Sequence, residues 1–231
     1  MTAIDVRPYR LDDSVDPSLR PLLALLETVA AAGDLPALAP GLGEAEGMTV
    51  RELATAPYTA LDEIIEAEMA LWNAPRHVAA TLWWKSFAYW SAIPIALGWA
   101  LNGTFPSFTA ENTLIRVLPD EPRMLLGMRE LAPATDVRAT LQALHAPLIE
   151  ALAKLTRAGR RNLWGSVAES LTRPLTSFAE LLPGSPDPAA LLERAGAPVS
   201  GLMEAGTGRR RTCCLWVTLP GNEACASCCL G

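Results

Sequence analysis

The side chains with the clearest capacity for chemistry are five cysteines, which all lie in the last nineteen residues of this 231-residue chain. They follow the pattern Cys213-Cys214-x10-Cys225-x2-Cys228-Cys229. Cysteines that served only as small apolar core residues would be scattered along the chain. The clustering therefore predicts that the thiols act together, as ligands of a structural zinc ion, as ligands of an iron–sulfur cluster, or as partners in disulfides.

The spacing alone does not decide among these sites. Cys225 and Cys228 have the separation of a zinc knuckle, whereas the adjacent Cys213 and Cys214 do not form a second knuckle. Neighbouring side chains tend to point apart, which a two-iron cluster accommodates with less strain than one small ion does. Spacing therefore favours an iron–sulfur cluster over zinc and leaves both open.

The amino terminus bears on the disulfide alternative. Asp5 and Arg7 place charge early in the chain, and no apolar run of signal-peptide length follows them. We therefore expect a cytoplasmic location. Stable disulfides are disfavoured in that reducing compartment.

Three stretches resemble one known family, the FhuF-type ferric-siderophore reductases. Residues 210–228 resemble the carboxy-terminal 2Fe-2S segment of that family, whose motif is Cys-Cys-x10-Cys-x2-Cys. Residues 162–168, Asn-Leu-Trp-Gly-Ser-Val-Ala, resemble a helical segment of these reductases. Residues 111–115, Glu-Asn-Thr-Leu-Ile, resemble a strand entry that the family shares with aerobactin-type siderophore synthetases.

The resemblance implies a cofactor, its ligands and an activity. It implies that one 2Fe-2S cluster is ligated by Cys213, Cys214, Cys225 and Cys228. It further implies that the protein passes one electron from this cluster to siderophore-bound Fe(III), with a hydroxamate siderophore favoured, and so releases Fe(II) in the cytoplasm. No catalytic residue beyond the cluster is then needed. Cys229 lies outside the motif and is expected to be a spare or packed thiol rather than a replacement for Cys228.

The residues around the cysteines suggest how the site is tuned and reduced. Three consecutive arginines, Arg209, Arg210 and Arg211, precede the first cysteine pair. Their positive charge would raise the reduction potential of an anionic cluster, or bind an acidic ferredoxin or flavodoxin that acts as the external electron donor. The alternative is that they form only a solvated basic turn. Trp216 lies in an expected strand, where it would cover the cluster, contact the siderophore, or pack in the core.

Composition excludes several other classes of protein. The formal net charge of −6 argues against a nucleic-acid binder and favours a neutral or cationic iron complex over an anionic one at long range. The uncharged stretch 86–110 loses its apolar character after Leu101, so we expect a buried core helix rather than a transmembrane segment. Peripheral association with a membrane stays open.

The alternatives to a reductase are a zinc-stabilised binding module without redox function and an iron–sulfur redox sensor or electron carrier.

Periodicity predicts the elements that must position the cysteines. Helices are expected at 18–32, 49–52, 60–73, 76–101, 137–158, 162–172 and 188–195. Gly33 closes the first helix, and a Pro/Gly-rich connection at 34–47 follows it. The helix at 49–52 begins with a capping box, and Pro94 should kink the helix at 76–101. Two apolar runs within 112–128, separated by a turn at 119–122, predict a β-hairpin. The expected fold is α+β, a mostly helical domain around a small antiparallel sheet. Residues 1–205 would form the reductase domain and 206–231 the cluster-binding segment.

Overall fold

The fold is that of a computed structural model, which describes residues 15–31, 47–118 and 124–230. The helices are α1 (Arg20–Ala31), α2 (Val50–Leu53), α3 (Thr59–Trp72), α4 (Arg76–Asn102), α5 (Val137–Thr156), α6 (Arg160–Ser177) and α7 (Pro188–Ala195). The strands are β1 (Met48–Thr49), β2 (Phe105–Pro106), β3 (Thr113–Val117), β4 (Met124–Met128) and β5 (Pro133–Ala134). The expectation of a mostly helical α+β protein with a small antiparallel sheet is confirmed.

Helix α4 forms the centre of the molecule. It packs against α1, α3, α5 and α6, with α6 as its most extensive neighbour. The apolar residues of α4 are distributed around the helix instead of forming one stripe, which is typical of a helix buried within a domain. Pro94 lies inside it, and Gly103, with a φ of 79°, ends it in the left-handed conformation that glycine adopts at little cost. None of the described helices combines the length and apolar character needed to cross a bilayer.

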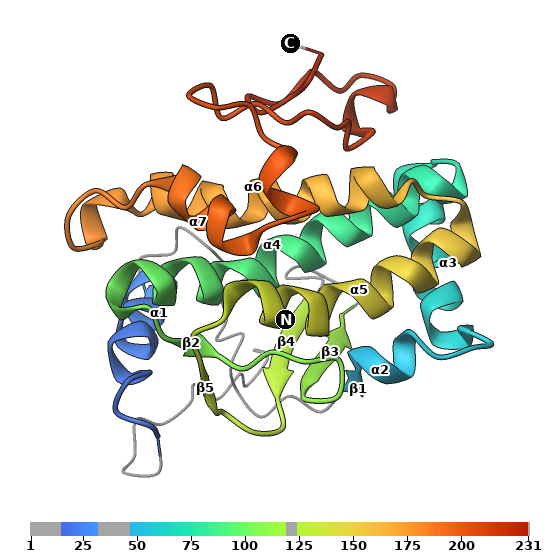
Figure 1. The fold of residues 1–231 in the computed structure, drawn as a ribbon. Coiled ribbons are helices and arrows are strands. Elements are labelled where there is room, and N and C mark those ends of the chain that lie inside the picture. The colour runs from blue at the N-terminus through green and yellow to red at the C-terminus, as the bar shows by residue number, and fades with distance from the viewer. Residues whose placement is uncertain (1–14, 32–46, 119–123, 231) are drawn as a thin grey trace.

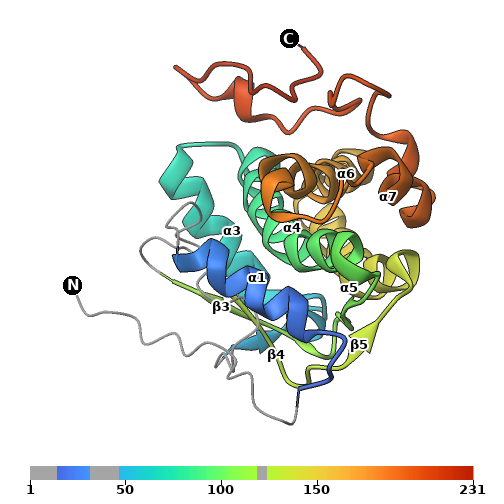
Figure 2. The ribbon, with the colours of Figure 1, turned by 90° about the vertical axis from the view of Figure 1, so that its left-hand side faces the viewer.

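The sheets lie on the opposite side of the helices from the C-terminal segment (Figures 1 and 2). Strands β1, β3 and β4 form one antiparallel sheet in that order, with Ile115 opposite Leu126, and β2 pairs with β5. The expected hairpin is therefore confirmed as β3 and β4, whereas its turn lies outside the described residues. The helices thus form a layer between the sheet and the cysteines.

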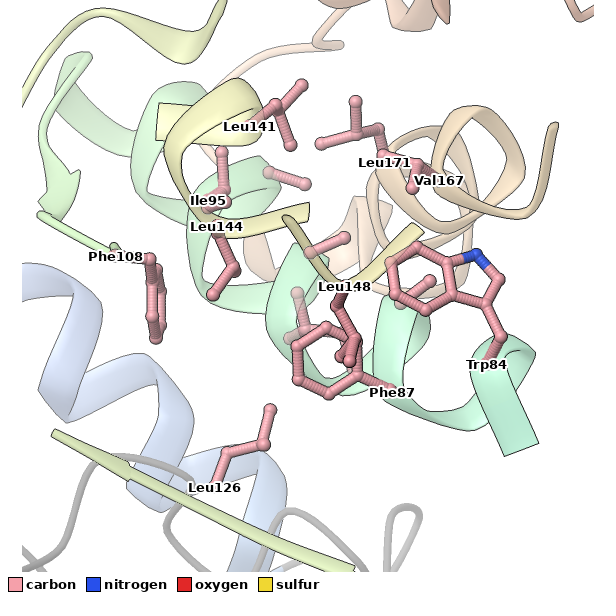
Figure 3. Close-up of a cluster of buried hydrophobic side chains, with 14 of the residues drawn as sticks. Trp84, Phe87, Ile95, Phe108, Leu126, Leu141, Leu144, Leu148, Val167 and Leu171 are labelled. Carbon is pink, nitrogen blue, oxygen red and sulfur yellow. The ribbon is translucent and has the colours of Figure 1, made fainter. Parts of the chain in front are cut away.

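Side chains from several elements meet in one core (Figure 3). Phe87 and Ile95 of α4, Leu126 of β4, Leu144 of α5 and Leu171 of α6 are all nearly inaccessible to solvent. Removing such groups from water is the main force that holds the layers together. The core gives α4 and α6 a fixed relative position, on which the site depends.

The observed helices follow the expected ones closely, with α6 as the main exception. It begins at Arg160 and continues through Pro174 to Ser177, beyond the predicted end at residue 172. The capping box is confirmed at α2, where Thr49 and Glu52 bond reciprocally. The predicted stop at Gly33 and most of the connection at 34–47 lie outside the described residues.

His145 is the one strongly perturbed titratable group in the described part of this core. It lies on α5 against the rings of Trp84, Phe87 and Trp164, and its Nε2 lies 2.9 Å from Ser91 Oγ. Burial lowers the pKa of His145 from its ordinary value of 6.5 to about 3. The imidazole is therefore neutral in the folded protein at physiological pH, which assigns it a structural role.

Acid should weaken the fold through His145. Between pH 6.5 and pH 3 the unfolded state binds a proton that the folded state does not, so stability is full above pH 6.5 and falls as pH decreases, by at most about 1.4 kcal/mol per pH unit. We expect the His145→Gln variant to show a shallower slope in urea unfolding between pH 7 and 5.5. His77→Gln changes the exposed second histidine and is the matched control. Equal slopes in all three proteins would contradict this assignment.

Candidate metal centre

The cysteine-bearing segment, residues 206–230, lies across α6 on the face of the helical layer away from the sheet (Figures 1 and 2). Its one regular piece in the described chain is a short 3₁₀ helix, η3 (Trp216–Thr218). The expectation that Trp216 lies in a strand is wrong. Leu215 has a φ of 65°, and the Thr218 amide donates to the Leu215 carbonyl, so the chain turns here instead of extending.

A buried ion pair fixes this segment to α6. The Arg210 side chain is 1% exposed, and its Nη1 lies 3.1 Å from Oε2 of Glu169, which is also buried. Arg210 Nη2 donates to Ser166 Oγ at 3.1 Å. Ser227 Oγ donates to the other oxygen of Glu169, and the Arg210 amide donates to the Ser227 carbonyl at 3.0 Å. One carboxylate of α6 therefore holds both ends of the cysteine segment.

A separate apolar cluster anchors the middle of the segment. Leu219 is buried against Ala74, Val78 and Leu82, which lie at the start of α4 and just before it. Trp216 meets Trp72 of α3 edge to face, with ring centroids 5.5 Å apart, a favourable geometry for aromatic pairs. The first half of the stretch between the two cysteine pairs, residues 215–219, is thus packed on the helical body.

Gly165 of α6 permits the close approach of the segment. A Cβ at this position would overlap Thr212 Oγ1, the hydroxyl of the residue that precedes Cys213. Glycine therefore allows the chain to pass directly over the helix. Gly165 belongs to the stretch 162–168 that carried the resemblance, and the structure gives that stretch a physical role.

The five thiols are gathered at this end of the molecule, with different environments. Cys214 and Cys228 are buried, whereas Cys213, Cys225 and Cys229 are partly exposed. Backbone amides donate to two of the sulfurs, that of Leu215 to Cys213 Sγ at 3.3 Å and that of Leu230 to Cys228 Sγ at 3.4 Å. A third sulfur, Cys225 Sγ, lies 3.6 Å from Ser227 Oγ. N–H donors directed at cysteine sulfur tune iron–sulfur centres.

The protonation of two thiols responds to these environments. Burial raises the pKa of Cys214, and the positive charges of Lys85 and Arg210 partly oppose that rise. Partial burial also raises the pKa of Cys229, and the neighbouring sulfurs of Cys213 and Cys228 add to it. Both groups are therefore protonated thiols near neutral pH, and binding of a metal by Cys214 would displace its proton.

The donor set fits an iron–sulfur group, although the thiols are not preassembled. In the described ranges, no three His, Cys, Asp or Glu side chains are placed to hold one metal ion together. The Arg210 Nε is buried without a hydrogen-bond partner in that same part of the chain, an arrangement that ordinarily costs about 1–3 kcal/mol. An anionic group held by adjacent thiols would suit this donor and the amides that already face the sulfurs.

The three consecutive arginines have different environments. Arg210 is enclosed by the ion pair, so it cannot reach a partner's surface, while Arg209 and Arg211 are exposed. Sequence reasoning missed Glu169 and Ser227. Ser166 and Glu169 lie three residues apart on one face of a helix, but nothing in the sequence shows that the two side chains are buried, so no local signal marked the docking site.

The arrangement defines an α+β protein that carries a thiol-rich, metal-binding segment docked on a helical body. Residues 210–230 match the family model described as the FhuF 2Fe-2S C-terminal domain. The resemblance of the cysteine segment is thereby confirmed, and the cofactor is a 2Fe-2S cluster. No curated protein matches the chain.

The buried ion pair makes a direct prediction for the three arginines. Arg210→Gln leaves the Glu169 carboxylate buried without its partner and should destabilise the protein by about 3 kcal/mol. Arg209→Gln and Arg211→Gln remove the same charge from exposed positions and should each cost less than about 0.5 kcal/mol. Denaturant unfolding of the three variants measures these differences. An Arg210→Gln variant as stable as the other two would show that the pair does not hold the segment.

Proposed function

We propose that this protein is a ferric-siderophore reductase that delivers one electron to siderophore-bound Fe(III) and releases Fe(II). The observation that carries the proposal is the match of residues 210–230 to the FhuF 2Fe-2S C-terminal domain, together with the docking of those residues on α6. Residues 206–231 form the cluster-binding segment in this proposal. Residues 1–205 form the domain that supplies its docking surface and the substrate site.

The ligands in this proposal are Cys213, Cys214, Cys225 and Cys228. The backbone amides that donate to the sulfurs of Cys213 and Cys228 support this choice. Cys214 and Cys228 are also the two buried thiols, which protects one ligand from each cysteine pair. Cys229 remains a non-ligand thiol.

The bound 2Fe-2S cluster would supply single electrons at a potential set by its hydrogen bonds, nearby charge and exposure. Arg210 is paired with Glu169, so the pair adds little net charge, and the amides that donate to Cys213 and Cys228 are the fixed dipoles that favour the reduced, more negative state. The anchored segment holds its cysteines at one surface, within reach of a large iron complex. The resulting Fe(II) ion binds the hard oxygen donors of the siderophore weakly, so the transfer of one electron releases the iron.

The electron must come from an external donor, and we assign this role to a ferredoxin or flavodoxin in the cytoplasm. Arg209 and Arg211 are exposed beside the cysteine segment and offer positive charge to an acidic partner. The hydroxamate class is the proposed substrate because its ferric complexes are stable while its ferrous complexes exchange rapidly.

A single-turnover experiment tests the activity. The protein is reduced anaerobically with dithionite, freed of excess reductant, and mixed with a ferric trihydroxamate and a ferrous-specific chelator. We expect about one Fe(II) per cluster, formed as the cluster absorption returns to its oxidised form. Reoxidation that is no faster with the ferric chelate than with a redox-inert gallium chelate would contradict the proposal.

Serine substitutions test the ligand set. Cys213→Ser, Cys214→Ser, Cys225→Ser and Cys228→Ser should each lose most of the iron, the sulfide and the visible absorption, because serine oxygen is a poor replacement for thiolate at such a cluster. Cys229→Ser should retain them and is the matched control, since it changes the same side chain one residue away. If Cys229→Ser loses the cluster and Cys228→Ser keeps it, the assignment of the fourth ligand is wrong.

A further inference from the structure

A cavity of about 360 Å³ lies where α3, α4 and α6 meet the cysteine segment. Its volume is within the range of small-molecule sites. Four aromatic side chains form much of its wall: Trp72, Tyr89, Trp90 and Trp216. They come from three separate parts of the chain, and Trp216 closes the cavity from the side of the cysteine segment.

The cavity reaches the proposed cluster directly, because Cys225 is part of its wall. A molecule in this cavity would therefore lie beside Cys225, one of the four proposed ligands. Electron transfer becomes faster as the distance between donor and acceptor falls, and a concave site beside Cys225 would hold the chelate close to the cluster.

Two cations give the cavity its charge. Lys85 of α4 and Arg173 of α6 both line it, and in the described ranges neither side chain has a carboxylate at ion-pair distance. The one carboxylate in the wall is Glu169, whose charge is already compensated by Arg210. The net charge of the side chains that line the cavity is therefore positive, although the formal net charge of the whole protein is −6.

Arg173 is also held in place by an aromatic partner. Its guanidinium carbon lies 5.6 Å from the centre of the Tyr89 ring, a cation–π distance. This contact leaves the N–H donors of Arg173 able to bind an anion. A planar guanidinium and a flexible ammonium on two neighbouring helices are suited to carboxylate oxygens.

We propose that this cavity binds the ferric chelate, and that Lys85 and Arg173 select chelates of net negative charge, namely hydroxamates that also carry carboxylate. The inference rests on the proposed reductase function and names its substrate class. The aromatic walls pack against the organic backbone of the ligand, and the cations bind its carboxylates. The net charge of the whole chain acts at long range, where salt screens it, so the two cations dominate once the chelate is within the cavity.

Transient kinetics with two substrates test the selection. The reduced protein is mixed with a ferric citrate-based dihydroxamate, which is anionic, or with a neutral ferric trihydroxamate. For Lys85→Gln and Arg173→Gln we expect the half-saturating concentration of the anionic chelate to rise about fivefold and that of the neutral chelate to change less than about twofold, the scale of a solvent-exposed charge pair.

Matched controls remove the same charges outside the cavity. Lys154→Gln on α5 and Arg194→Gln on α7 change exposed side chains that do not line it, and they should leave both substrates unaffected. If the cavity variants behave like these controls, or affect both chelates equally, the proposed selection is wrong. Slower cluster reduction by a ferredoxin with unchanged chelate kinetics would instead assign the cations to the electron donor and overturn the proposal.

A redox-inert probe separates this inference from the proposed function. Gallium(III) complexes of the same two ligands cannot be reduced, and their binding is followed by quenching of tryptophan fluorescence. Tighter binding of the anionic gallium complex, weakened in Lys85→Gln and Arg173→Gln, supports the cavity assignment even if no iron is reduced. Iron reduction without such a difference in binding would uphold the reductase and refute the charge selection.

Discussion

The ion pair between Arg210 and Glu169 is the interaction on which the rest of the site depends. Both groups are withdrawn from water, so each would be costly without the other. Ser227 bonds to the same carboxylate, and its backbone carbonyl accepts from Arg210. A segment with almost no regular secondary structure is therefore held at its two ends by one side chain of α6. This attachment brings both cysteine pairs to the same place.

The cavity exists because the segment is attached in this way. Its wall includes residues of α3, α4 and α6 as well as Trp216 and Cys225 of the segment, so neither part of the chain forms it alone. Gly165 allows the segment to pass close to α6, and the apolar cluster around Leu219 fixes the turn between the cysteine pairs. The helical body thus acts as more than a support, since it supplies most of the wall of the proposed substrate site.

Local sequence patterns predicted the helices well because amphipathic periodicity and capping depend on near neighbours. The cysteine segment predicted the cofactor through its resemblance to a known 2Fe-2S segment, whereas its spacing alone left zinc open. Glu169, Lys85 and Arg173 could not be found in this way, because their roles come from contacts between distant elements. Trp216 was misplaced for a similar reason. The residues beside Trp216 have a sequence typical of a strand, but they form a turn that packs on α3 and α4. Local sequence patterns do not reveal such packing.

The central claim is that the cysteine segment, docked on α6, holds one redox-active 2Fe-2S cluster. The most direct test is the iron, sulfide and zinc content of the anaerobically purified full chain, with a visible spectrum before and after dithionite. We expect two irons and two sulfides per chain and visible bands that bleach on reduction. One zinc per chain, with no sulfide and no colour, would contradict this claim and would indicate a zinc-stabilised module instead.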